Sequence, residues 1–351
     1  MKLICFYFLV FLVGFSACSS QSKPERKPVT NIQITPSNKT VIQGNEFSID
    51  ITSRVDNPKI EKIDVFLNNE LIKTSNSESF SIKVNSSEYL PGIYSVKTIA
   101  TNAKGETGTH YNTISILSNI QPKNLSYRII ETIPHNTSYF TQGLEFHNGI
   151  LYEGTGNYGQ SYVYAYLPNE GGKVLNQLKL DDRYFGEGIT ILNDKIYQLT
   201  YKSRKGFVYD VHTFEKLNEF SFQSDEGWGL CNDGTYLIMS DGTSKLSYLN
   251  PDNFEVVKTI EVSTPTGFVR NVNELEYVDG NIYANIWTTN TIVKFEAKTG
   301  KVLAFINMNN LLNMLDLRRA DVFNGIAYNE EEDLFYVTGK LWPQMFKVKF
   351  E

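Results

Sequence analysis

Five polar or aromatic residues open a sequence shape that recurs through the second part of the chain. They are Gln142, Glu187, Trp228, Asn273 and Asn324, and they follow one another at intervals of roughly 40 to 50 residues. Each precedes an apolar run, a polar turn and a second apolar run. Since these five side chains differ while the apolar positions repeat, we interpret them as a ring of functional groups, the ring residues. One carboxylate among amides and aromatic rings indicates general acid/base chemistry.

Further side chains reach the same end of each repeat. A hairpin that leaves the ring residues returns to them roughly 14 residues later, which places Tyr201 opposite Glu187 and Trp287 opposite Asn273. Lys340 takes the same place in the last repeat, where the acidic turn is longer. We therefore expect a lysine in the same pocket as the carboxylate.

Aromatic side chains should surround that carboxylate. Phe140 and Phe185 stand two residues before two of the ring residues, and side chains in a strand alternate with period two, so both should face the same side. Burial against rings raises the pKa of a carboxyl group towards neutrality, where one group can both take and return a proton.

Each of these residues also has a structural alternative. Glu187 could be a hydrogen-bonded anchor between repeats, and Lys340 could be a solvated surface cation. Asn324 fits a residue that satisfies backbone groups at a turn. Trp228 and Trp287 could belong to the core, although the flanking Gly and Asn make this less attractive.

The sequence lacks the residue patterns that other common catalytic chemistries require. The four histidines are scattered without a ligand spacing such as His-x-x-x-His, and no acidic cluster matches a calcium loop. No nucleophile elbow supports a Ser-His-Asp triad, and the Gly-rich loops lack the helix that a phosphate cradle needs. We therefore expect neither a metal ion nor another cofactor.

The repeats predict the elements that position these side chains. A period of roughly 40 to 50 residues built from short strands is typical of one propeller blade, so residues 124–351 are predicted to form a five-bladed β-propeller. Residues 206–215, 246–255 and 292–300 alternate apolar and polar residues around a turn, as half-buried hairpins do.

An all-β domain is also predicted in front of the propeller. Turn signals separate six strand-like runs between residues 29 and 120, and this pattern indicates an immunoglobulin-like β-sandwich without the paired cysteines of antibody domains. It offers no catalytic constellation, which favours a spacer or docking module. The expected strands are 31–35, 47–51, 62–67, 80–84, 94–100 and 111–117.

The first residues have the form of an export signal. Residues 1–17 contain one early lysine, a long apolar run and then small residues before Cys18, which resembles a bacterial lipoprotein signal that is removed while Cys18 is lipidated. Ordinary cleavage with an incidental Cys18 is the alternative. Residues 18–28 are polar and are expected to form a flexible tether.

Cysteine usage and charge fit an exported, lipid-anchored protein on the periplasmic or cell-surface side of a bacterial membrane. Only Cys231 remains in the mature domains, so no intramolecular disulfide is expected there. The net charge is −6, and the loss of Lys2 with the signal makes it more negative. A mildly acidic chain argues against nucleic acid as a partner.

The ordered motifs of residues 124–351 resemble the plant/bacterial-type glutaminyl-peptide cyclotransferases, also called glutaminyl cyclases. The resemblance does not extend to the N-terminal domain. It is carried by Phe140-Thr-Gln-Gly-Leu144, Glu153-Gly-Thr-Gly156, Phe185-Gly-Glu-Gly-Ile-Thr190, Glu226-Gly-Trp-Gly-Leu230, Met239-Ser-Asp-Gly-Thr243, Asn273-Glu-Leu-Glu276, Ala284-Asn-Ile-Trp287 and Val337-Thr-Gly-Lys-Leu-Trp-Pro343.

The resemblance implies a five-bladed propeller enzyme that converts the N-terminal glutamine of peptides and proteins to pyroglutamate, releases ammonia and needs no metal. By the same resemblance Glu187 shuttles the proton, while Asn273 and Lys340 hold the side-chain amide and stabilise the oxyanion. Gln142 orients the substrate. Phe140, Phe185, Trp228 and Trp287 form the walls, and Tyr201 stands where the family often carries Trp, which leaves the substrate range open.

Two other functions fit the same residues. A non-catalytic propeller could bind peptide or glycan at an aromatic mouth, because a fold does not determine a function. Another propeller hydrolase, such as a lactonase, would require a central metal ion.

Overall fold

The structure is a computed structural model that describes residues 27–54, 59–314 and 320–351. These residues form β-strands joined by short turns, with very little helix. The expected signal segment 1–17, the lipidation candidate Cys18 and most of the tether 18–28 lie outside the described residues. In the described part, no helix has the length and apolar character needed to cross a membrane.

The N-terminal region consists of two sheets packed face to face. β2 and β5 are strands that the sequence did not indicate, whereas the other six match the expected runs. One sheet is β1 (Thr30–Thr35), β3 (Glu46–Ser53) and β6 (Ser79–Asn85); the other is β2 (Thr40–Ile42), β8 (Thr107–Leu117), β7 (Gly92–Asn102), β4 (Ile60–Leu67) and β5 (Glu70–Ser75).

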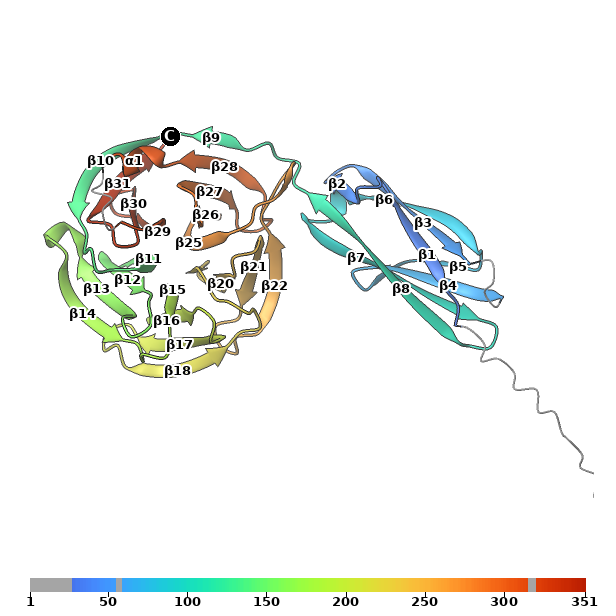
Figure 1. The fold of residues 1–351 in the computed structure, drawn as a ribbon, viewed down its shortest axis with the longest axis horizontal. Coiled ribbons are helices and arrows are strands. Elements are labelled where there is room, and N and C mark those ends of the chain that lie inside the picture. The colour runs from blue at the N-terminus through green and yellow to red at the C-terminus, as the bar shows by residue number, and fades with distance from the viewer. Residues whose placement is uncertain (1–26, 55–58, 315–319) are drawn as a thin grey trace, which may run out of the picture.

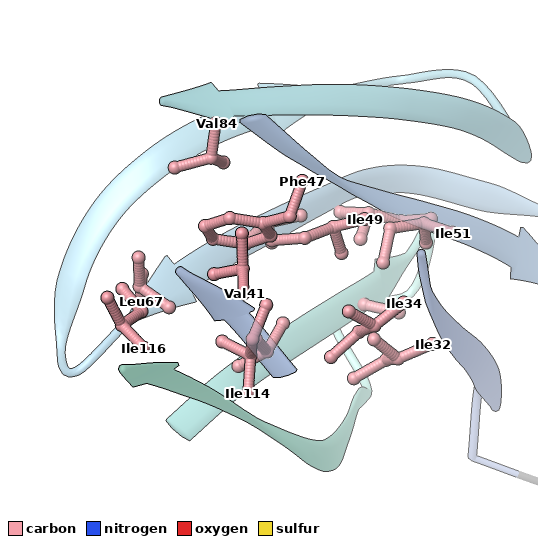
Figure 2. Packing of buried hydrophobic residues seen from close by; sticks show 14 of the residues in the cluster. Ile32, Ile34, Val41, Phe47, Ile49, Ile51, Leu67, Val84, Ile114 and Ile116 are labelled. Carbon is pink, nitrogen blue, oxygen red and sulfur yellow. The ribbon is translucent and has the colours of Figure 1, made fainter. Parts of the chain in front are cut away.

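Alternating side chains build one core between these sheets (Figure 2). Along β1 every second residue is buried, and Ile49 and Ile51 of β3 are fully buried against the opposite sheet. Each buried Ile or Val contributes about 1.5–3 kcal/mol relative to an exposed one. The core therefore gives this region a centre of its own, which is separate from those of the following sheets.

The remaining strands form sheets that stand around a common centre (Figure 1). In each sheet four strands lie side by side from the centre outwards, each antiparallel to the next. The sheets are β11 (Thr141–His147), β12 (Ile150–Thr155), β13 (Tyr162–Leu167) and β14 (Lys173–Lys179); β15 (Gly186–Leu192), β16 (Lys195–Thr200), β17 (Lys205–Asp210) and β18 (Lys216–Ser221); β19 (Leu230–Asn232), β20 (Leu237–Ser240), β21 (Lys245–Leu249) and β22 (Val256–Glu261); β25 (Val272–Val278), β26 (Asn281–Ile286), β27 (Thr291–Glu296) and β28 (Val302–Asn307); and β29 (Phe323–Asn329), β30 (Leu334–Gly339), β31 (Gln344–Phe350) and β10 (Tyr127–Pro134).

Three short elements complete the described chain. β23 (Ser263–Thr264) and β24 (Gly267–Phe268) form a two-stranded ribbon, and α1 spans Asn309–Leu312. The hairpins expected around 206–215, 246–255 and 292–300 are present as β17–β18, β21–β22 and β27–β28, so these three predictions are confirmed.

The chain enters and closes the ring of sheets at neighbouring places. After β8, the short strand β9 (Lys123–Leu125) pairs in parallel with β28 and extends that sheet. The next strand, β10, then pairs antiparallel with β31, the last strand of the chain. One sheet therefore combines the first and last strands of the ring, which ties its two ends together.

Glycines let the innermost strands of neighbouring sheets approach each other. A Cβ atom added at Gly143 or Gly188 would come within 3.0 Å of the backbone of the next sheet, and one at Gly229 would collide with the carbonyl oxygen of Asn273. This explains the glycine after three of the ring residues, while Gly325, which follows Asn324, has a φ of +124° that favours glycine. Glu274, which follows the fifth, accepts hydrogen bonds from the backbone N–H groups of two other innermost strands at 3.1 and 2.9 Å.

We expect Gly229→Ala to destabilise the protein by about 1–3 kcal/mol, because the added methyl group forces two backbones apart in a closely packed interior. Urea unfolding followed by circular dichroism measures this loss. Gly234→Ala serves as a matched comparison for crowding, since no atom lies within 4 Å of its Cβ position, although its φ of +81° adds its own strain. A Gly229→Ala protein as stable as the wild type would contradict the close approach.

The ring residues stand at irregularities of the innermost strands. The pairing register shifts between Thr141 and Gly143, and equivalent shifts occur in β15, β25 and β29 at Glu187, Asn273 and Asn324. Such bulges place extra residues on one strand and re-aim their side chains. The fifth ring residue, Trp228, lies just before the short strand β19.

Candidate active site

A cavity of about 410 Å³ opens where the innermost strands begin, and it brings together nine of the ten predicted catalytic and substrate-binding residues. The tenth, Asn324, is not among the residues that line it. The lining consists of Phe140, Gln142, Phe185, Glu187, Tyr201, Glu226, Trp228, Asn273, Trp287, Asp321, Val322 and Lys340.

The carboxyl group of Glu187 is buried at the base of this cavity. Its side chain is only 5% exposed, and its Oε1 atom accepts a hydrogen bond from Nε2 of Gln142 at 3.2 Å. Burial raises the pKa of Glu187 well above 4.5, the nearby charge of Glu226 raises it further, and Lys340 opposes both effects. A carboxyl group with a raised pKa holds its proton more readily than an exposed one, which suits a group that must both take and return a proton.

Lys340 is the buried cation of the site. It is 5% exposed, and its Nζ atom lies 4.7 Å from the centre of the Phe140 ring, a cation–π arrangement. Burial lowers the pKa of Lys340, while the charges of Glu187 and Asp321 act to raise it. The lysine is therefore not the solvated surface cation that the sequence left as an alternative.

Two buried amides stand beside each other. Nδ2 of Asn273 donates to Oδ1 of Asn324 at 2.9 Å, and Nδ2 of Asn324 donates to the carbonyl oxygen of Thr141 at 2.9 Å. Asn324 is completely buried and holds Asn273 and the start of β11, as the backbone-satisfying alternative proposed. Asn273 also lines the cavity, whereas Asn324 does not.

Aromatic rings form the walls of the cavity. The rings of Trp228 and Trp287 meet edge to face at 5.4 Å, and those of Phe140 and Phe185 do so at 6.1 Å. Tyr201 lies against Phe185 at 5.7 Å. Trp287 is 40% exposed, so it belongs to the mouth of the cavity and not to the core.

The structure corrects the expected strand register. The N–H group of Tyr201 donates to the carbonyl oxygen of Phe185, so Tyr201 stands level with Phe185 and not opposite Glu187. Trp287 likewise pairs with Asn271 and not with Asn273. The bulges at the ring residues account for both two-residue displacements.

Three lining residues, Glu226, Asp321 and Val322, were not singled out from the sequence. Glu226 accepts a hydrogen bond from Nε1 of Trp228 at 2.9 Å and forms an ion pair with Lys202 at 3.3 Å. It stands two residues before Trp228, as Val322 does before Asn324, so period-two alternation would have found both. No sequence signal pointed to Asp321.

The pH dependence of stability should report the raised pKa of Glu187. A group whose pKa is higher in the folded state contributes stability that is present at low pH and is lost as the pH rises through the folded pKa. Since Glu187→Gln cannot titrate, we expect its free energy of unfolding to fall less steeply above pH 4.5 than that of the wild type. Denaturant unfolding between about pH 4 and 8 measures both slopes, and equal slopes would contradict the raised pKa.

Comparison with known proteins identifies the family of this chain. The family model described as glutamine cyclotransferase matches residues 98–350. The chain belongs to the glutamine cyclotransferase family. The family match begins in β7, upstream of the motifs at residues 124–351.

Two relatives place the chain within this family. It is 38% identical over 236 residues to the glutaminyl-peptide cyclotransferase of Arabidopsis thaliana, a match that spans 65% of this chain and 73% of that protein. The crystal structure of Myxococcus xanthus glutaminyl cyclase is similar with a TM-score of 0.61 and 32% identity, and it covers 66% of this chain and 99% of that one.

No group of three or more His, Cys, Asp or Glu side chains that could hold a metal ion occurs in residues 27–54, 59–314 and 320–351.

Proposed function

We propose that this member of the glutamine cyclotransferase family is a glutaminyl-peptide cyclotransferase that uses Glu187 as its proton shuttle. The observation that supports it most directly is one aromatic cavity holding a buried carboxyl group, a buried lysine and an amide. The substrate is a peptide or protein with N-terminal glutamine, and the products are the pyroglutamyl peptide and ammonia.

The reaction closes a five-membered ring within one residue. The α-amino nitrogen of the substrate attacks the carbonyl carbon of its own side-chain amide, a C–N bond forms, and Glu187 accepts the proton that the amine loses. Glu187 then gives a proton to the departing amide nitrogen, the old C–N bond breaks, and ammonia leaves. Because the attack is intramolecular, a cavity that holds the side chain bent supplies much of the rate by proximity.

The surrounding residues act on charge and orientation. Negative charge develops on the carbonyl oxygen in the transition state, and the ammonium group of Lys340 and the amide of Asn273 stabilise it in a cavity of low polarity. Gln142, which already donates to Glu187, orients the substrate and the carboxylate. The rings of Trp228 and Trp287 enclose the glutamine side chain and exclude water.

An ammonia-release assay with the dipeptide Gln-Ala, with and without EDTA, tests the proposal. We expect one ammonia per peptide and no effect of the chelator. Binding of the peptide without ammonia release would indicate a non-catalytic propeller, and activity lost on chelation would indicate a metal-dependent hydrolase. Either outcome would overturn the proposed reaction.

The proposed architecture is a five-bladed β-propeller of residues 124–351 behind an immunoglobulin-like sandwich of residues 29–120. The sheets around a common centre support the first part, and the two packed sheets with one core support the second. We also propose export and lipid anchoring through Cys18, which rest on the sequence. Mass spectrometry of the mature N-terminus tests the anchor, since an unmodified residue there would contradict it.

A further inference from the structure

A buried histidine lies behind the candidate active site and takes no part in the proposed reaction. His135 follows β10, its side chain is 1% exposed, and its ring meets Tyr139 edge to face at 5.8 Å. The Nε2 atom stands 3.2 Å from both carboxylate oxygens of Glu153, which is completely buried. The Nδ1 atom stands 2.8 Å from the carbonyl oxygen of Trp342.

The partners of the two ring nitrogens determine its protonation. The carbonyl oxygen of Trp342 can only accept a hydrogen bond, so Nδ1 carries a proton. The Thr338 hydroxyl, 3.3 Å from Nδ1, is consistent with this because it donates its own proton to the carbonyl oxygen of Gln344. The Glu153 carboxylate also accepts from the hydroxyl groups of Thr141 at 2.6 Å and Tyr166 at 2.7 Å. Because a carboxylate has only acceptor atoms, Nε2 of His135 must also donate to it. A ring that donates from both nitrogens is an imidazolium.

This ion pair connects two segments that carry active-site residues. On one side His135 holds the carbonyl of Trp342, two residues after Lys340. On the other side Glu153 holds the hydroxyl of Thr141, which stands between Phe140 and Gln142. The backbone supports the same connection, because the N–H group of Leu341 donates to the carbonyl oxygen of Tyr139 at 2.8 Å.

We propose that His135 and Glu153 are positioning residues, a buried ion pair that holds the Lys340 turn and the start of β11 in the arrangement that the reaction needs. This inference rests on the proposed function. Neither residue touches the cavity, and both act through Lys340, Phe140 and Gln142. A small displacement of a group that stabilises the transition state is costly, so loosening this connection lowers kcat more than it raises KM.

The groups around the imidazole set its pH response. Burial alone would lower the pKa of His135, but the charge of Glu153 and the hydrogen bonds to Glu153 and Trp342 outweigh it and raise the pKa. Besides His135 and Glu153 themselves, Tyr139, Tyr164 and Tyr166 are the titratable groups close to the pair, and burial raises the pKa values of all three, so they stay neutral. The ion pair therefore weakens as the pH rises through the folded pKa of His135, which lies above its ordinary value.

Nitrogen NMR of the histidine rings in the full-length wild type tests the ion pair. The chain has four histidines, and the signal missing from His135→Asn assigns the one in question. We expect both ring nitrogens of His135 to remain protonated at pH 7.5, where an exposed histidine is largely neutral. A neutral His135 at that pH would overturn the ion pair whether or not the protein has cyclase activity.

Steady-state kinetics with Gln-Ala tests the positioning role. We expect kcat per folded molecule to fall roughly 10–100-fold in His135→Asn, with a KM change of about threefold or less. Thr141→Val, which removes one hydrogen bond to Glu153 and leaves the pair intact, should show a smaller fall in the same direction. His212→Asn, at an exposed histidine of the β17–β18 turn, is the matched control.

The outcomes separate a positioning role from a structural one. A His135→Asn protein with a lower melting temperature but the wild-type kcat per folded molecule would overturn the proposal and leave the proposed function intact. A wild type without ammonia release would overturn the proposed function and, with it, the positioning role, while the NMR result would still decide the ion pair.

Discussion

Replacing Glu187 by glutamine is expected to lower kcat for Gln-Ala by roughly 10²–10⁴-fold, the contribution of one well-placed general acid/base. The substitution keeps the shape of the side chain and can keep the contact with Gln142, but the amide neither accepts nor returns a proton. Ammonia release under saturating substrate measures the loss. The far-UV circular dichroism spectrum should match that of the wild type, because the cavity walls are unchanged.

A control at the second carboxylate makes this result specific. Glu226 lines the same cavity, is bonded to Trp228 and Lys202, and has no part in proton transfer in the proposed mechanism. We expect Glu226→Gln to retain far more activity than Glu187→Gln. If Glu187→Gln turned over at the wild-type rate, Glu187 would have no place in the mechanism.

Replacing Lys340 by methionine is expected to lower kcat by roughly 10²–10³-fold, the usual cost of removing one group that stabilises an oxyanion. Methionine fills a similar volume against Phe140 without the charge. The change also removes the cation that opposes the raised pKa of Glu187, so that pKa should rise further. The acid limb of the kcat profile should therefore move to higher pH.

Lys202→Met is the matched comparison for this charge removal. The Lys202 side chain is 59% exposed at the edge of the cavity and pairs with Glu226, so its loss should change kcat little. A Lys340→Met enzyme with the wild-type kcat and an unmoved acid limb would show that Lys340 neither stabilises the transition state nor sets the proton affinity of Glu187.

Equivalence between repeats is what made the cavity predictable from the sequence. Residues at the same place in each repeat converge at the centre of the ring, so Gln142, Glu187 and Asn273 could be grouped without any knowledge of distances. Strand alternation then added Phe140 and Phe185. The same rule, applied to Trp228, would have added Glu226.

The sequence could not show how the innermost strands bulge. An extra residue in a strand is invisible to a period-two pattern, and this is why Tyr201 was expected two residues away from its actual level. Asn324 was expected among the substrate-binding residues for a related reason, since equivalence places a residue at the centre but does not say whether it faces the cavity or lies beneath it.

Contacts between segments that are far apart in the sequence could not be predicted either. His135 and Trp342 lie 207 residues apart, and no spacing rule connects a lone histidine with a carbonyl group near the other end of the chain. In the N-terminal region the long alternating strands were predictable, whereas β2 has three residues and β5 has no buried side chain, so neither produces a periodic pattern.

The shared sheet of β10 and β31 has a consequence for biosynthesis. Lys340 directly follows β30 in the turn that leads into β31, the last strand made, and His135, which follows the early strand β10, holds the carbonyl of Trp342 in the same turn. While the ribosome still holds β31, the lysine has no fixed place beside Glu187. In the proposed mechanism the catalytic residues therefore come together only after translation of the last strand, and we expect a chain truncated before Gln344 to be inactive even if its first four sheets had already folded.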